Sequence, residues 1–238
     1  MLVTVIGRGH SGTRAISQTL SESNVYMGEP LNKSWDLIPP HDMYEACRVF
    51  AKYVKYLGGM KWDFSKVMEM DPDPVFVKLI ESYLSSVLKS DSVNKGWKIP
   101  ETTLVYPWIQ KMFPKAYYIH WVRDPRDCIL SSHMTDDLND FGIEYDKSGD
   151  IRKNRAISWY YQRELVRNTP FAEHQVSIRF EDMVYEQDKT IEKLEEFLNI
   201  PLVKIPMRTD SVGRYLTDND VHMYDFFKND MKECGYGF

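Results

Sequence analysis

VIGRGHSGTR, residues 5–14, is the stretch of this 238-residue sequence that decides the predicted fold. Gly7, four further residues and Gly12 match the start of the phosphate-binding pattern G-x-x-x-x-G-K-[ST]. The lysine that would hold the β- and γ-phosphates of ATP is missing, because Thr13-Arg14 stands where Lys-Ser or Lys-Thr is expected. The stretch therefore indicates either an anion site unlike that for ATP or a tight turn that binds nothing.

The residues on both sides of this loop predict a strand followed by a helix. Residues 2–6 are short, apolar and β-rich, as in a buried parallel strand, and residues 13–21 have a helical composition. In open α/β sheets, ligands bind at the carboxyl ends of the strands, where a helix N-terminus also attracts anions. Ser11 and Thr13 add hydroxyl donors, and Arg14 adds a guanidinium suited to bidentate contact with an oxyanion. This position favours the anion site over the empty turn.

The rest of the chain alternates between strand-like and helix-like segments. Further strands are expected at 25–28, where Gly28 ends the run, and at 96–100, 116–122 and 176–180, with helices at 43–57, 75–88, 102–113, 127–135, 151–168, 189–200 and 218–232. Such alternation predicts an α/β fold, a three-layer sandwich with a central parallel sheet between two helical layers. We find no repeat, low-complexity tract or linker, so residues 1–238 are expected to form a single domain.

Composition and charge exclude several classes of partner. The net charge of −5 disfavours a nucleic-acid partner, which requires a basic face. Three distant cysteines and six scattered histidines lack metal-ligand spacing, so no metal is expected. The chain opens directly on a strand, with neither a signal peptide nor an apolar run long enough to cross a bilayer. A cytoplasmic protein without a membrane partner is the expectation.

A second basic pair follows the strongest predicted strand. Arg123 comes directly after residues 116–122, and Ser131 lies eight positions later, on the predicted helix 127–135. Two turns of helix could bring both side chains to one phosphate. The alternative is a salt bridge from Arg123 to Asp124 or Asp127, because a buried arginine without a partner is costly.

Five motifs, in order from Val3 to Pro201, resemble the PAPS-dependent sulfotransferase family, whose donor is 3′-phosphoadenosine 5′-phosphosulfate. They are SGTR, GWK-P, VRDPRDCILSS, IRFEDMV and EKLEEFLNIP. The resemblance implies a P-loop NTPase-like fold in which the first loop holds the 5′-phosphosulfate and the arginine–serine pair holds the 3′-phosphate. It also implies in-line transfer of the sulfuryl group to a hydroxyl, giving PAP, without a metal. Thr13-Arg14 is similar to the G-T-R of carbohydrate sulfotransferases.

The same resemblance implies the residues that bind the nucleotide. Ser11, Gly12, Thr13 and Arg14 would form the 5′ site, with Arg8, Gly9 and His10 also among the nucleotide-binding residues, and Arg123 and Ser131 would form the 3′ site. Arg214 resembles the late basic loop that closes over the 3′-phosphate, and the alternative is a solvated arginine in a turn. One departure is His10, because the family usually has Lys or Arg before S-G-T. A neutral imidazole is a weaker cation at this position, and Arg8 could supply the missing charge.

Glu29 and Lys98 complete the expected catalytic set with His10. Glu29, at the C-terminal edge of the predicted strand that stops at Gly28, resembles the catalytic glutamate of tyrosylprotein sulfotransferases, and burial would raise its pKa. Lys98 matches the lysine of the mid-chain WK-P motif and would stabilise the leaving phosphate. The alternatives are a surface carboxylate for Glu29 and a solvated strand-edge lysine for Lys98, while Glu101 and His133 are reserve bases.

Two other functions remain open at this point. A small P-loop kinase would need the Walker lysine, which is absent, and a nucleotide-binding module could have lost its chemistry through His10. The acceptor is expected to be a hydroxyl of a small molecule or carbohydrate, with residues 31–95 as its wall. Aromatic residues could frame the adenine or the acceptor, although core packing is the more common role for aromatics at helical spacing. These are Trp97, Trp159, Tyr160 and Tyr161. Neither the identity of the acceptor nor the oligomeric state follows from the sequence.

Overall fold

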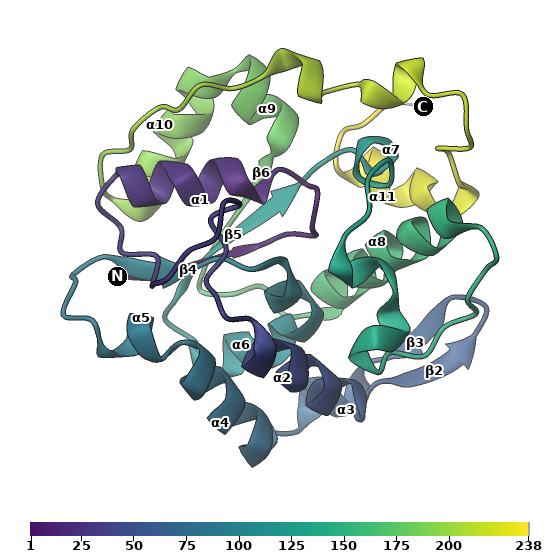
Figure 1. The fold of residues 1–238 in the computed structure, drawn as a ribbon, viewed down its shortest axis with the longest axis horizontal. Coiled ribbons are helices and arrows are strands. Elements are labelled where there is room, and N and C mark those ends of the chain that lie inside the picture. The colour runs from purple at the N-terminus through teal and green to yellow at the C-terminus, as the bar shows by residue number, and fades with distance from the viewer. Residues whose placement is uncertain (238) are drawn as a thin grey trace.

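A parallel sheet of four strands forms the centre of the protein in a computed structural model that describes residues 1–237. The strand order is β4-β1-β5-β6, and every neighbouring pair is parallel (Figure 1). The strands are β1 (Leu2–Ile6), β4 (Lys95–Trp97), β5 (Tyr117–Val122) and β6 (His174–Arg179). The predicted α/β fold with a central parallel sheet is confirmed.

Helices cover both faces of this sheet because its strands are apolar on both sides. On one face, Val3 and Val5 of β1 pack with α1 (Thr13–Glu22), α9 (Phe180–Tyr185) and α10 (Gln187–Leu198). On the other face, Ile6 and Tyr118 pack against helices that include α2 (His41–Ala51), α4 (Pro74–Tyr83), α6 (Tyr106–Met112) and α8 (Ile151–Asn168). Figure 1 shows these two layers on opposite sides of the strands.

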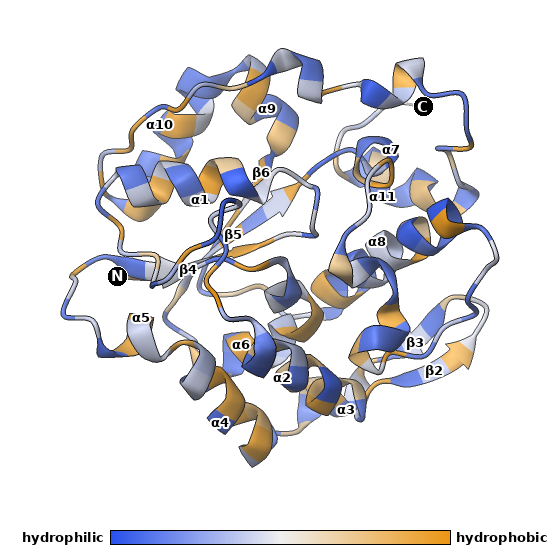
Figure 2. Cartoon of the chain, in the orientation of Figure 1, coloured by the Kyte–Doolittle hydropathy of each residue, from blue (hydrophilic) through white to orange (hydrophobic). Residues whose placement is uncertain are grey.

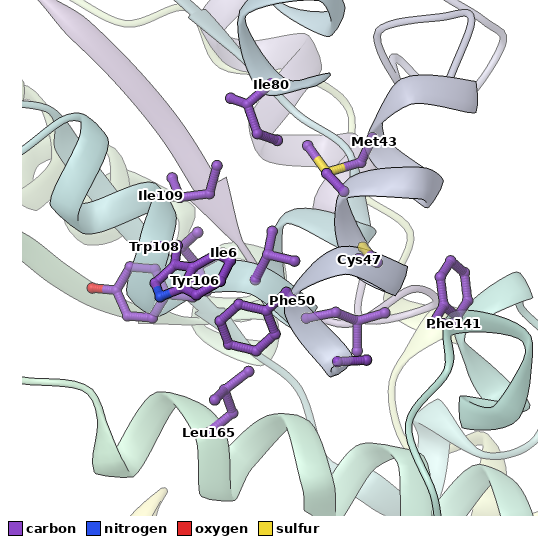
Figure 3. Packing of buried hydrophobic residues seen from close by; sticks show 14 of the residues in the cluster. Ile6, Met43, Cys47, Phe50, Ile80, Tyr106, Trp108, Ile109, Phe141 and Leu165 are labelled. Carbon is purple, nitrogen blue, oxygen red and sulfur yellow. The ribbon is translucent and has the colours of Figure 1, made fainter. Parts of the chain in front are cut away.

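The larger core cluster is rich in aromatic residues. Side chains from α2, α6 and α8, among them Phe50, Trp108 and Leu165, converge on Ile6 (Figure 3). The Phe50 and Trp108 rings meet edge to face at 5.1 Å between centroids, a favoured aromatic geometry. Hydrophobic and hydrophilic residues alternate around α1 and α10 in Figure 2, as expected for helices with one buried face.

The predicted helix 43–57 is wrong at its C-terminal end. Helix α2 stops at Ala51, and β2 (Lys55–Gly58) pairs antiparallel with β3 (Lys61–Asp63). Gly58 and Gly59 have positive φ values of 84° and 57°, which allow the tight turn between these two strands. The hairpin leads to α3 (Ser65–Glu69), and the predicted helix 75–88 is divided at Leu84 into α4 and α5 (Ser85–Lys89).

The segment predicted as a strand at 25–28 contributes only a single parallel bridge, between Tyr26 and Lys95. The expected end at Gly28 agrees with its φ of 78°, a conformation that favours glycine, so Glu29 lies beyond this segment. The helix predicted at 102–113 begins instead as a 3₁₀ helix, η1 (Pro100–Val105), and becomes α6 at Tyr106.

The helix predicted at 127–135 is also wrong. Helix α7 (Pro125–Cys128) has a single turn, and the chain continues irregularly to the 3₁₀ helices η2 (Met134–Asp136) and η3 (Leu138–Phe141). His133 starts η2 by accepting a hydrogen bond from the Thr135 N–H, while Asp136 accepts one from the His133 N–H. This reciprocal cap begins a new element where the sequence had suggested a continuing helix.

The tail contains short elements in place of the helix predicted at 218–232. They are η4 (Thr209–Ser211), η5 (Arg214–Thr217), η6 (Asp225–Phe227) and α11 (Lys228–Glu233). Phe227 and Met231 pack against Trp159 of α8 in a third buried cluster. Among residues 1–237, no helix has the length and apolar character needed to cross a membrane.

Candidate functional site

The first loop, residues 7–12, turns its carbonyl groups toward the protein interior. Each carbonyl of residues 8–11 accepts a hydrogen bond from a protein donor. The Arg8 carbonyl accepts from the N–H and the hydroxyl of Ser11, at 3.1 and 2.5 Å. The Gly9 carbonyl accepts from the Arg8 guanidinium at 2.9 Å, and the His10 carbonyl accepts from the Arg123 guanidinium at 3.0 Å. The Ser11 carbonyl accepts from the Trp121 indole at 2.9 Å. The loop is therefore held from behind in one conformation.

The N–H groups of the same loop are left available. Those of Gly9, His10 and Gly12 have no hydrogen-bond acceptor among residues 1–237. Helix α1 then begins at Thr13 without a side-chain cap, so its positive end is open at the same place. Converging N–H groups at a helix N-terminus are a site for an anion.

Two glycines are required for this loop to approach its neighbours. A Cβ on Gly9 would lie 2.1 Å from Cγ of the His133 ring. Gly12 has a φ of 86°, and a Cβ there would lie 2.4 Å from the Phe180 ring. The glycines predicted for close main-chain approach are therefore in tight contact with two rings.

A cavity of about 250 Å³ opens in front of the loop. It is lined by seven residues expected from the sequence, which are Gly9, His10, Gly12, Thr13, Arg14, Lys98 and Arg123, together with the reserve base His133. Three further lining residues, Ser34, Asp36 and Pro100, were not expected. Five expected residues lie outside this lining, namely Arg8, Ser11, Glu29, Ser131 and Arg214. The structure thus brings together the first loop and Lys98, which are about 90 residues apart in the sequence.

Arg14 and Lys98 supply cations of two different kinds. Arg14 is exposed, and no ion pair joins it to any residue in 1–237, so its guanidinium can meet a ligand. Lys98 is buried, and its Nζ donates to Asp36 Oδ1 at 2.5 Å and to the Ser34 carbonyl at 2.7 Å. Burial lowers the pKa of Lys98, and the Asp36 carboxylate opposes this change. The expected alternative of a solvated lysine is wrong.

Asp36 is the main functional candidate that sequence reasoning missed. It lies in the loop after Glu29, and no local pattern distinguishes it from a surface aspartate. Its Oδ2 accepts from the Asn32 amide at 3.0 Å, so the carboxylate is oriented by hydrogen bonds at both oxygens. The structure makes it the ion-pair partner of the expected catalytic lysine.

Arg8 does not supply the charge that His10 lacks. Its guanidinium is buried, forms an ion pair with Asp136 and donates to the carbonyls of Gly9 and Cys128. Asp136 also accepts from the His133 N–H, so Arg8 braces the wall of the cavity from behind. The suggestion that Arg8 compensates for His10 is therefore corrected.

The two histidines of the cavity differ in exposure, because His10 is exposed whereas His133 is largely buried. Desolvation lowers the pKa of His10, although a hydrogen bond from its Nε2 to the Ser132 carbonyl opposes this effect. Burial, assisted by the Arg8 guanidinium, lowers the pKa of His133 to about 3. Since Nδ1 of His133 accepts from the Thr135 N–H at 3.2 Å, its Nε2 carries the proton and can only donate. His133 is thus unsuited to the role of base.

Arg123 is occupied by protein acceptors. Its guanidinium donates to the His10 and Ser211 carbonyls, contacts Asp127 Oδ2 at 3.3 Å and lies over the Phe180 ring at 4.6 Å. The predicted alternative of an ion pair with Asp127 is therefore present. A phosphate on Arg123 would have to replace the Ser211 carbonyl.

Ser131 and Arg214 are not joined to Arg123 as expected. Ser131 lies in a bend and not two helical turns after Arg123, because α7 ends at Cys128. Arg214 is exposed at the start of η5. Neither residue lines the cavity in front of the first loop.

The carboxylates proposed as bases differ in exposure. Glu29 is exposed, and its N–H donates to the Ser86 hydroxyl at 3.3 Å, so the expected burial of Glu29 is wrong. Glu101 is 2% exposed, and burial raises its pKa to about 7, with Asp36 acting in the same direction. Sequence reasoning had ranked the exposed carboxylate above the buried one.

The aromatic residues considered for stacking are core residues. Trp97, Trp159 and Tyr161 are buried in hydrophobic clusters, and Tyr160 packs at their edge. A separate cavity of about 820 Å³ runs along β6 and contains none of the expected nucleotide-binding residues. No group of three or more potential metal ligands occurs within residues 1–237.

Comparison with known proteins identifies the family of this chain. A sequence model described as "Sulfotransferase family" matches residues 3–204. No curated protein matches the sequence.

Three solved sulfotransferase structures share the fold at low sequence identity. The sulfotransferase domain from the curacin biosynthetic pathway has a TM-score of 0.57 at 11% identity, covering 99% of this chain and 98% of that domain. The sulfotransferase domain from the Synechococcus PCC 7002 olefin synthase has a TM-score of 0.58 at 13% identity, covering 100% and 96%. A sulfotransferase from Mycobacterium avium has a TM-score of 0.55 at 12% identity, covering 99% and 77%. The match over most of the chain shows that this protein belongs to the sulfotransferase family.

Proposed function

We propose that this protein transfers the sulfuryl group of PAPS to a hydroxyl of an acceptor, giving PAP. The observation that carries the proposal is the first loop: its Gly9, His10 and Gly12 N–H groups have no acceptor among residues 1–237, and these residues line one cavity with the unpaired Arg14 and the buried Lys98. A 5′-phosphosulfate is an anion of the kind that such a loop holds. A loop without the Walker lysine suits a donor that has no β,γ-phosphate bridge.

The residues present fit this co-substrate. PAPS would supply an activated sulfuryl group whose departure leaves negative charge on the 5′-phosphate. The N–H groups of Gly9, His10 and Gly12 would bind that phosphate, and Arg14 would add a bidentate cation. Fixed donors aimed at a developing charge are the largest source of rate in reactions of this type.

Lys98 would stabilise the leaving oxygen. Its ammonium is fixed in position by Asp36 and the Ser34 carbonyl, and Lys98 lines the cavity in front of the first loop. A buried ammonium is poorly solvated and therefore acts more strongly on a nearby anion. Asp36 would keep Lys98 charged and oriented.

Glu29 remains the proposed base, as an exposed carboxylate that an acceptor hydroxyl can reach. Glu101 would need to approach the acceptor from a buried position, and its raised pKa leaves it partly protonated near neutral pH. Paired substitutions separate the two carboxylates. Glu29→Gln should retain PAP binding and lose turnover, whereas Glu101→Gln should retain turnover, and the reverse pattern would transfer the role to Glu101.

A second candidate function is a binding module that holds the nucleotide without efficient turnover. The observation that favours it is His10, whose Nε2 is bound to the Ser132 carbonyl and whose pKa is lowered by desolvation. A neutral imidazole would stabilise the leaving phosphate less than a lysine. If His10 limits catalysis, His10→Lys should raise turnover strongly. An unchanged turnover would instead favour a sulfotransferase that is active with His10 in place.

Thermal unfolding with nucleotides provides the first test. PAP should raise the Tm and ATP should not, because the loop lacks the Walker lysine. Arg14→Ala should reduce the PAP effect, while Arg208→Ala, an exposed arginine paired with Asp210 outside the cavity, should leave it unchanged. Equal effects of PAP and ATP would support a kinase instead.

We further propose a cytoplasmic protein that acts on a small-molecule or carbohydrate hydroxyl. The three cysteines are free, as is usual in a reducing compartment. The segment 31–95 contributes Ser34 and Asp36 to the cavity and is the proposed acceptor wall. Incubation with labelled PAPS and pooled hydroxyl compounds would identify the acceptor class.

A further inference from the structure

A small internal cavity lies behind the first loop. Its volume is about 20 Å³, which is room for one water molecule. Arg8, Arg123 and Gln162 are among its lining residues, and each is more than nine-tenths buried. The cavity therefore lies between the loop after β1, the end of β5 and helix α8.

The same three residues carry buried polar atoms without a hydrogen-bond partner. These atoms are Nε of Arg8, Nε of Arg123 and Oε1 of Gln162. A buried polar atom without a partner costs about 1–3 kcal/mol. Because all three atoms belong to residues that line one cavity with room for a single water, they point to a shared partner.

The chemistry of these atoms defines that partner. Each Nε–H needs an acceptor, whereas Oε1 of Gln162 needs a donor. The orientation of the Gln162 amide is set by its Nε2, which donates to the Ser158 hydroxyl at 3.0 Å, and that hydroxyl in turn donates to the Thr135 carbonyl. Oε1 is therefore the atom left without a donor. A chloride ion would satisfy the two arginines but not the glutamine.

We propose that this cavity holds one buried water molecule, which accepts from the Nε–H groups of Arg8 and Arg123 and donates to Oε1 of Gln162. Arg8 and Arg123 donate to the Gly9 and His10 carbonyls and thereby hold the first loop, so the water would connect both arginines to Gln162 of helix α8. If the proposed function holds, this connection makes the affinity for the nucleotide depend on helix α8.

A crystal structure at a resolution that places waters tests the site directly. One density peak within hydrogen-bond distance of all three atoms is expected, with no anomalous signal after a bromide soak. A bromide peak in the cavity would show that the site holds an anion and not a water, and an absence of density would mean that the cavity is empty; either result would overturn the proposal. In solution, the Hε protons of Arg8 and Arg123 should show cross-relaxation with a long-lived water, and its absence would also count against the site.

Two variants test whether Oε1 of Gln162 is a hydrogen-bond partner of the water. Gln162→Met removes Oε1 and leaves the water with only its two arginine donors, so the density should weaken, the Tm should fall by about 2–4 °C and PAP binding should weaken by about five- to tenfold. Ser158→Ala removes the partner of the Gln162 amide nitrogen but keeps Oε1, so the density should persist. Unchanged density in Gln162→Met would refute the assigned partners. Since density and cross-relaxation require no nucleotide, their failure is distinguishable from failure of the proposed function.

Discussion

Substitution of Gly9 by alanine tests whether the conformation of the first loop requires the close contact between Gly9 and the His133 ring. The added Cβ would lie 2.1 Å from Cγ, 2.3 Å from Cδ2 and 2.3 Å from Nδ1 of the His133 ring. The ring cannot move freely, because its Nδ1 accepts from the Thr135 N–H and the His133 N–H donates to Asp136. Either the ring or the loop must therefore shift.

The expected cost of Gly9→Ala is about 1–3 kcal/mol, the range for overpacking a close contact. In a domain of this size, each 1 kcal/mol lowers the Tm by about 2–4 °C. The same shift should displace the unpaired N–H groups of the first loop and therefore remove the PAP-induced rise in Tm.

A double-mutant cycle provides the control. His133→Ala removes the ring, so Gly9→Ala should cost little in that background, and the two substitutions should show a coupling energy of about 1–3 kcal/mol. Urea unfolding of the four proteins gives this value, and thermal shift with PAP should show partial recovery in the double variant. Additive costs would refute the inferred contact between Gly9 and His133.

Two further predictions concern buried charges near the cavity. Asp36→Asn leaves the buried Lys98 ammonium without its negatively charged partner, so the free energy of unfolding measured in urea should fall by about 3–5 kcal/mol. Lys98→Met should partly restore this stability, and an equal loss in the double variant would contradict the pairing. Burial raises the pKa of Glu101 from its ordinary 4.5 to about 7, so the folded state binds more protons than the unfolded state between these pH values, and stability should fall as pH rises through that window. Glu101→Gln should remove this decrease of stability with pH, and above pH 7 its free energy of unfolding should exceed that of the native protein by up to about 3 kcal/mol. Identical pH profiles of the free energy of unfolding would show that the pKa of Glu101 is not raised.

The sheet was predictable because its strands are buried on both faces and read as short apolar runs. Residues 2–6 and 116–122 correspond closely to β1 and β5, and the helix predicted at 151–168 matches α8. These elements depend on local composition and hydrophobic periodicity. The loop after β1 was recognisable because its glycine spacing is also local.

The incorrect predictions involve contacts between distant residues. The helix expected after residue 127 ends early because His133 and Asp136 form a new cap, and Asp136 is held by Arg8, more than a hundred residues away. The strand expected at 25–28 ends at Gly28 as predicted but is reduced to a single bridge between Tyr26 and the distant Lys95. The contacts that decide both outcomes are made with residues far away in the sequence.

The partners of the arginines were equally hidden from the sequence. Arg8 and Arg123 look like phosphate ligands because they follow the ends of strands, yet both donate to main-chain carbonyls of the first loop. Only the fold shows that these carbonyls point inward. The distinction between a ligand that holds an anion and a support that shapes its site requires the tertiary structure.

A crystal structure of the protein with PAP tests the central claim most directly. The account predicts that the 5′-phosphate accepts hydrogen bonds from the N–H groups of Gly9, His10 and Gly12, with the Arg14 guanidinium beside it and Lys98 facing the position of the missing sulfuryl group. A 5′-phosphate bound away from the first loop, or no bound nucleotide at saturating PAP, would contradict it.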